Sequence, residues 1–132
     1  MPTSTKLVRD DLFENMATMY QSLLTAALDQ TLAENGIGDS AIRQKICEEF
    51  VFWHGNLHDQ MWIKQSGGER IFPLLCFTKR FLNIGTPVDE LGDVFAGAQF
   101  FSWHEYALGS VAAHFEQGPA DIEMGCVGPS DV

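Results

Sequence analysis

The sequence predicts a mainly α fold, a bundle of about four helices with a central C-terminal helix. Three observations support this prediction. Apolar residues recur every three or four positions through the first half of the chain. A segment between residues 94 and 113 is apolar on almost every helical face. Of the 132 residues, 45% are hydrophobic, which is enough for one domain with a real core.

The first predicted helix runs from about Lys6 to Asn35. Gly36 then ends it, because glycine adopts the left-handed conformation of a helix C-terminus without steric cost. The apolar positions with helical spacing are Val8, Leu12, Met16, Met19, Leu23, Ala27 and Leu28. We expect this face to cover the core.

A second helix is predicted after Gly38, Asp39 and Ser40, which form a short turn and an N-cap. Its apolar stripe consists of Ile42, Ile46, Phe50, Trp53 and Leu57. The link between the two helices is only a few residues long, and short links usually join antiparallel neighbours. We therefore expect the two helices to pack antiparallel.

Two interpretations compete for the region that follows Gln60, where Ser66–Gly68 indicate a turn. In one, residues 61–77 form a small β-hairpin with Pro73 at an edge. In the other, which we favour, Pro73 opens a helix that ends before Gly85. Half of the eight basic residues form a basic island here, at Lys64, Arg70, Lys79 and Arg80.

The central helix is predicted to start at Pro87, with Thr86 as its N-cap, and to reach Gln117. Gly97 marks a place for a kink or break, so the segment is one long helix or two in tandem. The stretch is apolar all round, so we expect it to be buried on most sides. Four small residues share a strip that would admit a second backbone: Ala98, Ser102, Gly109 and Ala113.

Large apolar residues on other faces of this segment predict a homodimer, because a domain of this size can hardly cover the helix alone. The interface candidates are Phe100, Phe101, Trp103 and Leu108. The formal charge of −10 argues against nucleic-acid binding. It is typical of a surface that keeps a protein soluble, and it also fits a basic protein partner. The membrane is not a predicted partner either, because His104 and Glu105 interrupt the only apolar stretch of sufficient length.

The three cysteines, Cys47, Cys76 and Cys126, are far apart and odd in number, so neither a disulfide framework nor a zinc knuckle is predicted. Together with the absence of a signal-peptide pattern at the start, this favours a cytoplasmic protein. Residues 1–117 are predicted to form a single helical domain. Residues 118–132 are predicted to form a flexible acidic tail.

The candidate ligand or metal site lies on the second helix. His54 and His58 are four residues apart, so they project from the same side of a helix, as two imidazole ligands of one metal ion do. His104 or Glu105 could complete such a site only if the fold brought the two helices together. Glu105 is also expected to need a partner, because it lies in the least polar stretch of the chain.

No nucleophile elbow, phosphate-binding loop, dinucleotide fingerprint or calcium loop occurs in the sequence. The leading hypothesis is therefore a small acidic protein that acts by protein–protein interaction, as an inhibitor, an immunity-type factor or a chaperone-like factor. The alternative is a helical protein that binds a metal or a small ligand, with or without enzyme activity, through the pair of His54 and His58. The catalytic residues and the cofactor of such a protein are not specified by the sequence.

Overall fold

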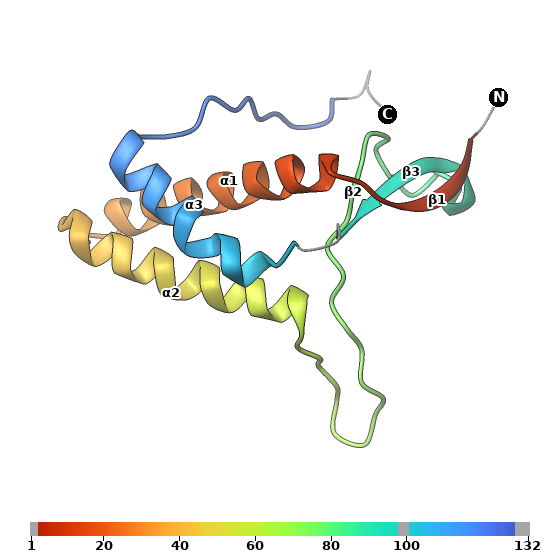
Figure 1. The fold of residues 1–132 in the computed structure, drawn as a ribbon, viewed down its shortest axis with the longest axis horizontal. Coiled ribbons are helices and arrows are strands. Elements are labelled where there is room, and N and C mark those ends of the chain that lie inside the picture. The colour runs from red at the N-terminus through yellow and green to blue at the C-terminus, as the bar shows by residue number, and fades with distance from the viewer. Residues whose placement is uncertain (1–2, 98–100, 129–132) are drawn as a thin grey trace.

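The fold was analysed in a computed structural model, which describes residues 3–97 and 101–128. Its elements in chain order are β1 (Thr3–Arg9), α1 (Leu12–Glu34), α2 (Ser40–Asp59), β2 (Phe77–Thr78), the 3-10 helix η1 (Val88–Glu90), β3 (Leu91–Ala96) and α3 (Trp103–Gln117). Three α-helices lie side by side, and a small sheet extends from one end of them (Figure 1). The described part of the chain is thus mixed α/β, and the prediction of a mainly α bundle of about four helices is only partly correct.

The sheet has the strand order β1-β3-β2. Strand β1 pairs with β3 in parallel, with Val8 opposite Phe95 and Arg9 opposite Ala96, and β2 pairs with β3 antiparallel. In β1 the side chains from Ser4 to Leu7 are exposed, and Val8 alone of residues 4–9 is half-buried. The predicted first helix therefore begins later than expected, at Leu12, because the residues before it form a strand.

The helix predicted to start at Pro87 is wrong. Pro87 is followed by one turn of 3-10 helix and then by strand β3. Gly92 has φ = +75°, a conformation outside the right-handed helical region. A helix does occupy the end of the segment, but it begins at Trp103, beyond the expected break at Gly97.

Two predicted helix boundaries are confirmed: the end of α1 and the start of α2. Asn35 is the C-cap of α1, and Gly36 follows with φ = +93°. Asp39 is the N-cap of α2, and its carboxylate accepts a hydrogen bond from the Ala41 amide at 2.9 Å. The two helices pack side by side in opposite directions, as expected from their short link (Figure 1).

The core lies in two clusters that α3 connects. One cluster joins the sheet to the helices and contains Phe13, Ala17, Phe95 and Trp103. The other lies between α2 and α3, with α1 beside it, and contains Cys47, Val51, Ala107 and Val111. Gln21 and Thr25, also buried, run between them on α1. Gln21 donates to the Trp103 carbonyl at 2.7 Å and accepts from Ser110 at 2.8 Å, so its buried amide ties α1 to α3.

Both predicted apolar stripes lie at the margin of the core rather than in its centre, although Met16 and Leu28 of the first stripe pack against the core clusters. On α1 the buried positions are Phe13, Ala17, Gln21 and Thr25, while Leu12 and Met19 are each 45% exposed. On α2 the buried positions are Cys47, Val51 and Gly55. Much of the apolar surface that the sequence pattern places in the interior therefore remains exposed in a single chain.

Residues 60–75, here called the arm, lie between α2 and β2 and project away from the helices (Figure 1). The favoured prediction for this region, a helix that opens at Pro73, is wrong. The alternative prediction, a hairpin, is correct only for one antiparallel bridge. In this bridge, Ile63 and Ile71 exchange two hydrogen bonds of 2.9 Å. Gly67, with φ = +79°, turns the chain at the tip.

The last described residues, 118–128, contain no helix or strand. They run back along α1 (Figure 1), and Ile122 lies against the same hollow as Met16 and Met19. All three cysteines are free thiols. Within the ranges that the structure describes, none of the helices is both long and apolar enough to cross a bilayer.

Candidate functional site

The junction of α2 and α3 brings the predicted site residues together. Gly55 lies against the backbone at the start of α3, so close that a Cβ atom placed on it would be 2.6 Å from the His104 nitrogen and 2.7 Å from the His104 Cα. The sequence predicts that small residues of the last helix let another backbone come close. In the structure, a small residue of α2, Gly55, allows this close contact instead. On the predicted small-residue strip, a Cβ atom placed on Gly109 would have no neighbour within 4 Å, and Ala98 lies outside the described residues.

Asp59, the last residue of α2, caps the first turn of α3. Its carboxylate accepts hydrogen bonds of 2.8 Å from the backbone amides of Trp103 and His104. The N-cap residue itself, Ser102, makes no side-chain cap; its hydroxyl donates instead to Asp59 at 3.0 Å. A carboxylate at this position satisfies otherwise unpaired amides and interacts favourably with the helix dipole. Asp59, a residue of α2, thus binds the first free amides of α3, which the N-cap residue of a helix usually binds itself.

Asp59, His104 and Ser102 do not form a nucleophilic triad. The Nδ1 atom of His104 lies in hydrogen-bond contact with the Asp59 carboxylate and also with the Ser102 hydroxyl. A triad needs its serine and its carboxylate on opposite ring nitrogens, so that one orients the ring while the other loses its proton. Both groups meet the same nitrogen here, and this cluster therefore fits a structural joint.

His54 and His58 face the same side of α2, as their spacing predicts. Their ring centroids are 4.7 Å apart. Tyr20 stacks on His54 with a centroid distance of 6.2 Å, and Trp103 lies 6.4 Å from His58. The Nδ1 atoms of both histidines are buried and have no hydrogen-bond partner. An unpaired buried polar atom costs about 1–3 kcal/mol, so this pair is held in place by the surrounding packing.

The contact of His54 with His58 is expected to make the free energy of unfolding depend on pH. Burial, and next the charge of His58, lower the pKa of His54 below its usual value. The unfolded chain therefore binds a proton more readily than the folded chain, and we expect the free energy of unfolding to fall as the pH drops below about 6.5. Urea denaturation between pH 5 and pH 8 measures this. His54→Gln should flatten the pH dependence, and an unchanged profile in that variant would contradict the assignment.

The histidines do not assemble into a complete metal site. Among the side chains in residues 3–97 and 101–128, no three His, Cys, Asp or Glu residues are grouped so that they could hold a metal ion. His104 is directed to Asp59, and Glu105 is exposed. The expectation that Glu105 needs a partner in an apolar environment is therefore wrong, because α3 turns this residue to the surface.

A second histidine site lies at the other end of α3, where the carboxylate of Asp29 contacts both Arg43 and His114. Arg43 Nε is 2.6 Å and His114 Nε2 is 2.9 Å from the carboxylate. Burial alone would raise the pKa of Asp29, but the hydrogen bonds from His114 and Arg43, together with their charges, lower it overall. The stability that this ion pair adds is present above the usual pKa of an aspartate and is lost as the pH falls through the lowered value.

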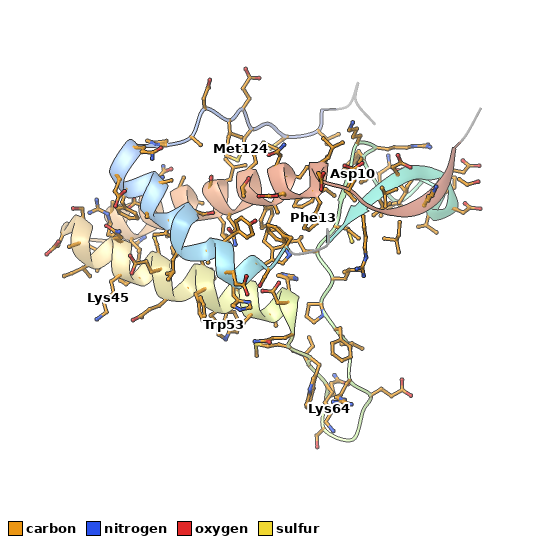
Figure 2. All side chains as sticks on the ribbon, viewed as in Figure 1. Asp10, Phe13, Lys45, Trp53, Lys64 and Met124 are labelled. Atoms are coloured by element: carbon orange, nitrogen blue, oxygen red, sulfur yellow. The ribbon has the colours of Figure 1, made fainter. Side chains whose placement is uncertain are left out.

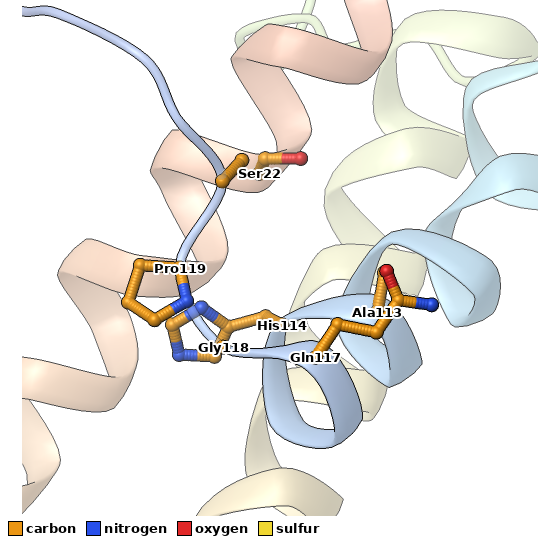
Figure 3. Close-up of a pocket in the computed structure, with 7 residues that line it drawn as sticks. Ser22, Ala113, His114, Gln117, Gly118 and Pro119 are labelled. Carbon is orange, nitrogen blue, oxygen red and sulfur yellow. The ribbon is translucent and has the colours of Figure 1, made fainter.

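His114 also borders a small pocket of about 150 Å³ where the chain leaves α3 (Figure 3). Gly118, with φ = +87°, makes the turn, and Pro119 closes one side. The polar nitrogen of His114 that could meet a ligand is already bonded to Asp29. This pocket therefore offers little chemistry of its own.

The interface candidates of the last segment have different environments. Trp103 is only 4% exposed and belongs to the core of its own chain. Phe101 is half-buried and packs against the same cluster, whereas Leu108 is 52% exposed. Phe100 lies outside the described residues. Trp103 is thus not available to a second molecule in this fold.

The predicted basic island divides into two parts. On the arm, the charged groups of Lys64 and Arg70 lie over the ring of Trp62, at 5.9 and 5.2 Å from its centroid. Near the sheet, Lys79 lies 5.7 Å from the Phe95 ring, and Arg80 donates to the Glu90 carbonyl at 2.7 Å. Of the four basic residues, only Lys64 and Arg70 lie on the projecting arm.

The largest exposed apolar surface combines the arm with the apolar stripe of α2. The stripe residues Ile42, Phe50 and Trp53 are 51%, 41% and 51% exposed. On the arm the exposed residues are Met61, Trp62, Ile63, Ile71, Phe72 and Leu74. Figure 2 shows the labelled Trp53 and Lys64 on the side of α2 that faces away from α1. We call these nine apolar residues the arm–α2 surface. The helical periodicity of the sequence identifies the apolar stripe of α2, but its prediction that this stripe is buried in the core is wrong for Ile42, Phe50 and Trp53.

Comparison of the chain with protein-family models, with curated proteins and with solved structures finds no match.

Proposed function

We propose that this protein acts by binding another protein through the arm–α2 surface, as an inhibitor, an immunity-type factor or a chaperone-like factor does. The observation that supports this proposal most directly is the exposure of nine large apolar side chains, three on one face of α2 and six on the arm that follows it. Exposed apolar patches of this kind mark sites of protein interaction.

The amount of exposed apolar area is in the range of a specific interface. The nine side chains expose between 37% and 69% of their area. At about 200 Å² for a large side chain, they leave on the order of 900 Å² of apolar area in water. A stable protein interface buries about 800 Å² on each partner. Because neighbouring side chains of the arm point to opposite sides, a partner reaches this total only by enclosing the arm.

The arm by itself has little to hold it in its extended shape. Its two segments share one bridge, between Ile63 and Ile71, and its apolar side chains are mostly exposed. An isolated two-stranded hairpin is marginally stable in water. A partner that covers Trp62 and Phe72 would remove this apolar area from water and would order the arm in the same step.

The charges suggest how the partner meets the surface. The formal charge of −10 favours the encounter with a basic protein, since long-range attraction mainly affects the association rate. At the contact itself, Lys64 and Arg70 flank Trp62, so carboxylates at the edge of an apolar patch on the partner would fit the arm. A second copy of this chain supplies carboxylates but is itself acidic, so the charge favours a different, basic protein as the partner. We place the predicted homodimer on this surface rather than on α3.

Replacing Trp62 and Phe72 together by serine tests the proposal. Because both side chains are exposed, at 42% and 63%, the fold should keep its stability. The affinity for the partner should fall at least about 30-fold, the loss of a central aromatic contact in an interface. Affinity capture with the purified wild-type chain, followed by titration of the captured protein, measures this loss.

Leu108→Ser is the matched control, because Leu108 is also an exposed large apolar residue but lies on α3. It should bind the partner as the wild type does. Sedimentation velocity of each protein alone shows whether the partner is a second copy. Equal binding by the double variant and the wild type, or a loss only in the Leu108 variant, would refute the assignment of this surface.

A further inference from the structure

A pocket lies at the junction of the sheet and the helices, beside the end of the arm, and shares Leu74 with the arm–α2 surface. Its volume is about 290 Å³, and its lining comes from β1, the end of α2, the arm, β3 and α3. Arg9 and Ala96 are the last residues of the parallel strands β1 and β3, and they lie opposite each other in the register. The carboxyl ends of parallel strands are where α/β proteins commonly bind small ligands.

Arg9 is the group in this pocket that is free to bind. It is exposed, and among the described residues it forms no ion pair with a carboxylate. An arginine presents several N–H donors in a planar fork that matches a carboxylate in two parallel hydrogen bonds. His58 also lines the pocket, but its unpaired Nδ1 atom is buried and does not face the ligand space.

The carboxylate of Asp59, which also lines the pocket, is already satisfied. It accepts from the amides of Trp103 and His104, from the Ser102 hydroxyl and from the His104 ring. These donors hold its charge toward α3 and reduce its repulsion of an incoming anion. Of the charged side chains that line the pocket, Arg9 is therefore the one left free to bind an anion.

The other side chains that line the pocket are apolar and include Leu75, Phe101 and the buried Trp103, beside exposed polar atoms of the lining. A pocket of about 290 Å³ has room for about ten water-sized groups. A single arginine matches one monovalent carboxylate, and aromatic walls match a flat apolar body. We propose that this pocket binds a small organic acid in which one carboxylate, held by Arg9, is attached to an aromatic or branched apolar group packed against Phe101 and Trp103.

Phenylacetate is the probe that tests this site on the full-length chain, with acetate and inorganic phosphate as comparisons. Isothermal titration calorimetry should show saturable binding of phenylacetate at millimolar concentration or below. Acetate should bind at least about tenfold more weakly, because it lacks the apolar body. In NMR spectra, the backbone amides of Gly97 and Trp103 should shift as phenylacetate is added. No saturable binding, or shifts confined to other regions, would overturn the proposal.

Two variants of Arg9 locate the carboxylate. Arg9→Gln should weaken phenylacetate binding at least about tenfold, the loss of a charge-assisted pair of hydrogen bonds. Arg9→Lys should retain part of the affinity, since it keeps the charge without the planar fork. Lys45→Gln, an exposed cation on α2 outside the pocket, should change nothing. Equal affinity of Arg9→Gln and the wild type would refute the site, as would phosphate binding as tightly as phenylacetate.

Discussion

Replacing Gly55 by alanine is expected to destabilise the protein by about 3 kcal/mol or more, at the upper end of what overpacking costs. The added Cβ would lie 2.6 Å from the His104 nitrogen and 2.8 Å from the Trp103 carbonyl carbon. These are backbone atoms at the start of α3, which cannot rotate away as the end of a flexible side chain can. The helices α2 and α3 would have to separate, and the core between Val51 and Ala107 would open.

Gly109→Ala is the matched control for this effect. Gly109 also lies inside a helix, α3, but nothing is within 4 Å of a Cβ placed there. Alanine should therefore stabilise the protein by up to about 1 kcal/mol, through its better helix propensity. Urea denaturation followed by circular dichroism measures both variants. If Gly55→Ala were as stable as the wild type, α2 and α3 could not be packed as closely as described.

Replacing Asp59 by alanine is expected to lower the free energy of unfolding by about 2–4 kcal/mol. An N-cap contributes about 1 kcal/mol on average, and each buried amide left without a partner adds about 1–3 kcal/mol. Asp59 serves the amides of both Trp103 and His104 and also holds the His104 ring. Its removal therefore weakens the start of α3 and the joint between two helices at once.

Amide hydrogen exchange provides a readout that a general loss of stability would not produce. In the Asp59 variant, the amides of Trp103 and His104 should exchange faster than those in the middle of α3. Asp39→Ala removes a local cap with one hydrogen bond, to Ala41, and should cost only about 1 kcal/mol. Equal losses in the two variants would show that the contact of Asp59 with α3 has no special role.

The parts of the fold that depend on neighbouring residues could be predicted from the sequence. Gly36 and Asp39 mark the end of α1 and the start of α2 because capping is decided within a few residues. The same local logic fails at Thr86 and Pro87, where the signals for a helix start are present. They are followed by a single 3-10 turn, because the next residues pair with β1, a strand near the opposite end of the chain.

The candidate site could be predicted only in part. The spacing of His54 and His58 places them on one face of α2, and the structure agrees. The roles of Asp59 and Gly55 could not be predicted, because they arise from contacts with α3, far along the chain. The sequence pattern puts Arg9 in a helix, whereas its place at the end of a parallel strand depends on the pairing of β1 with β3.

The sequence by itself determined where α1 ends and α2 begins, which residues share a helical face and how much apolar surface the chain has to cover. Only the tertiary structure decided which faces are covered. A periodic pattern reports that a stripe is apolar, but burial depends on which other element packs against it. The stripe of Ile42, Phe50 and Trp53 has the pattern of a core, yet α3 packs instead against the neighbouring face at Cys47, Val51 and Gly55, where the glycine permits close contact.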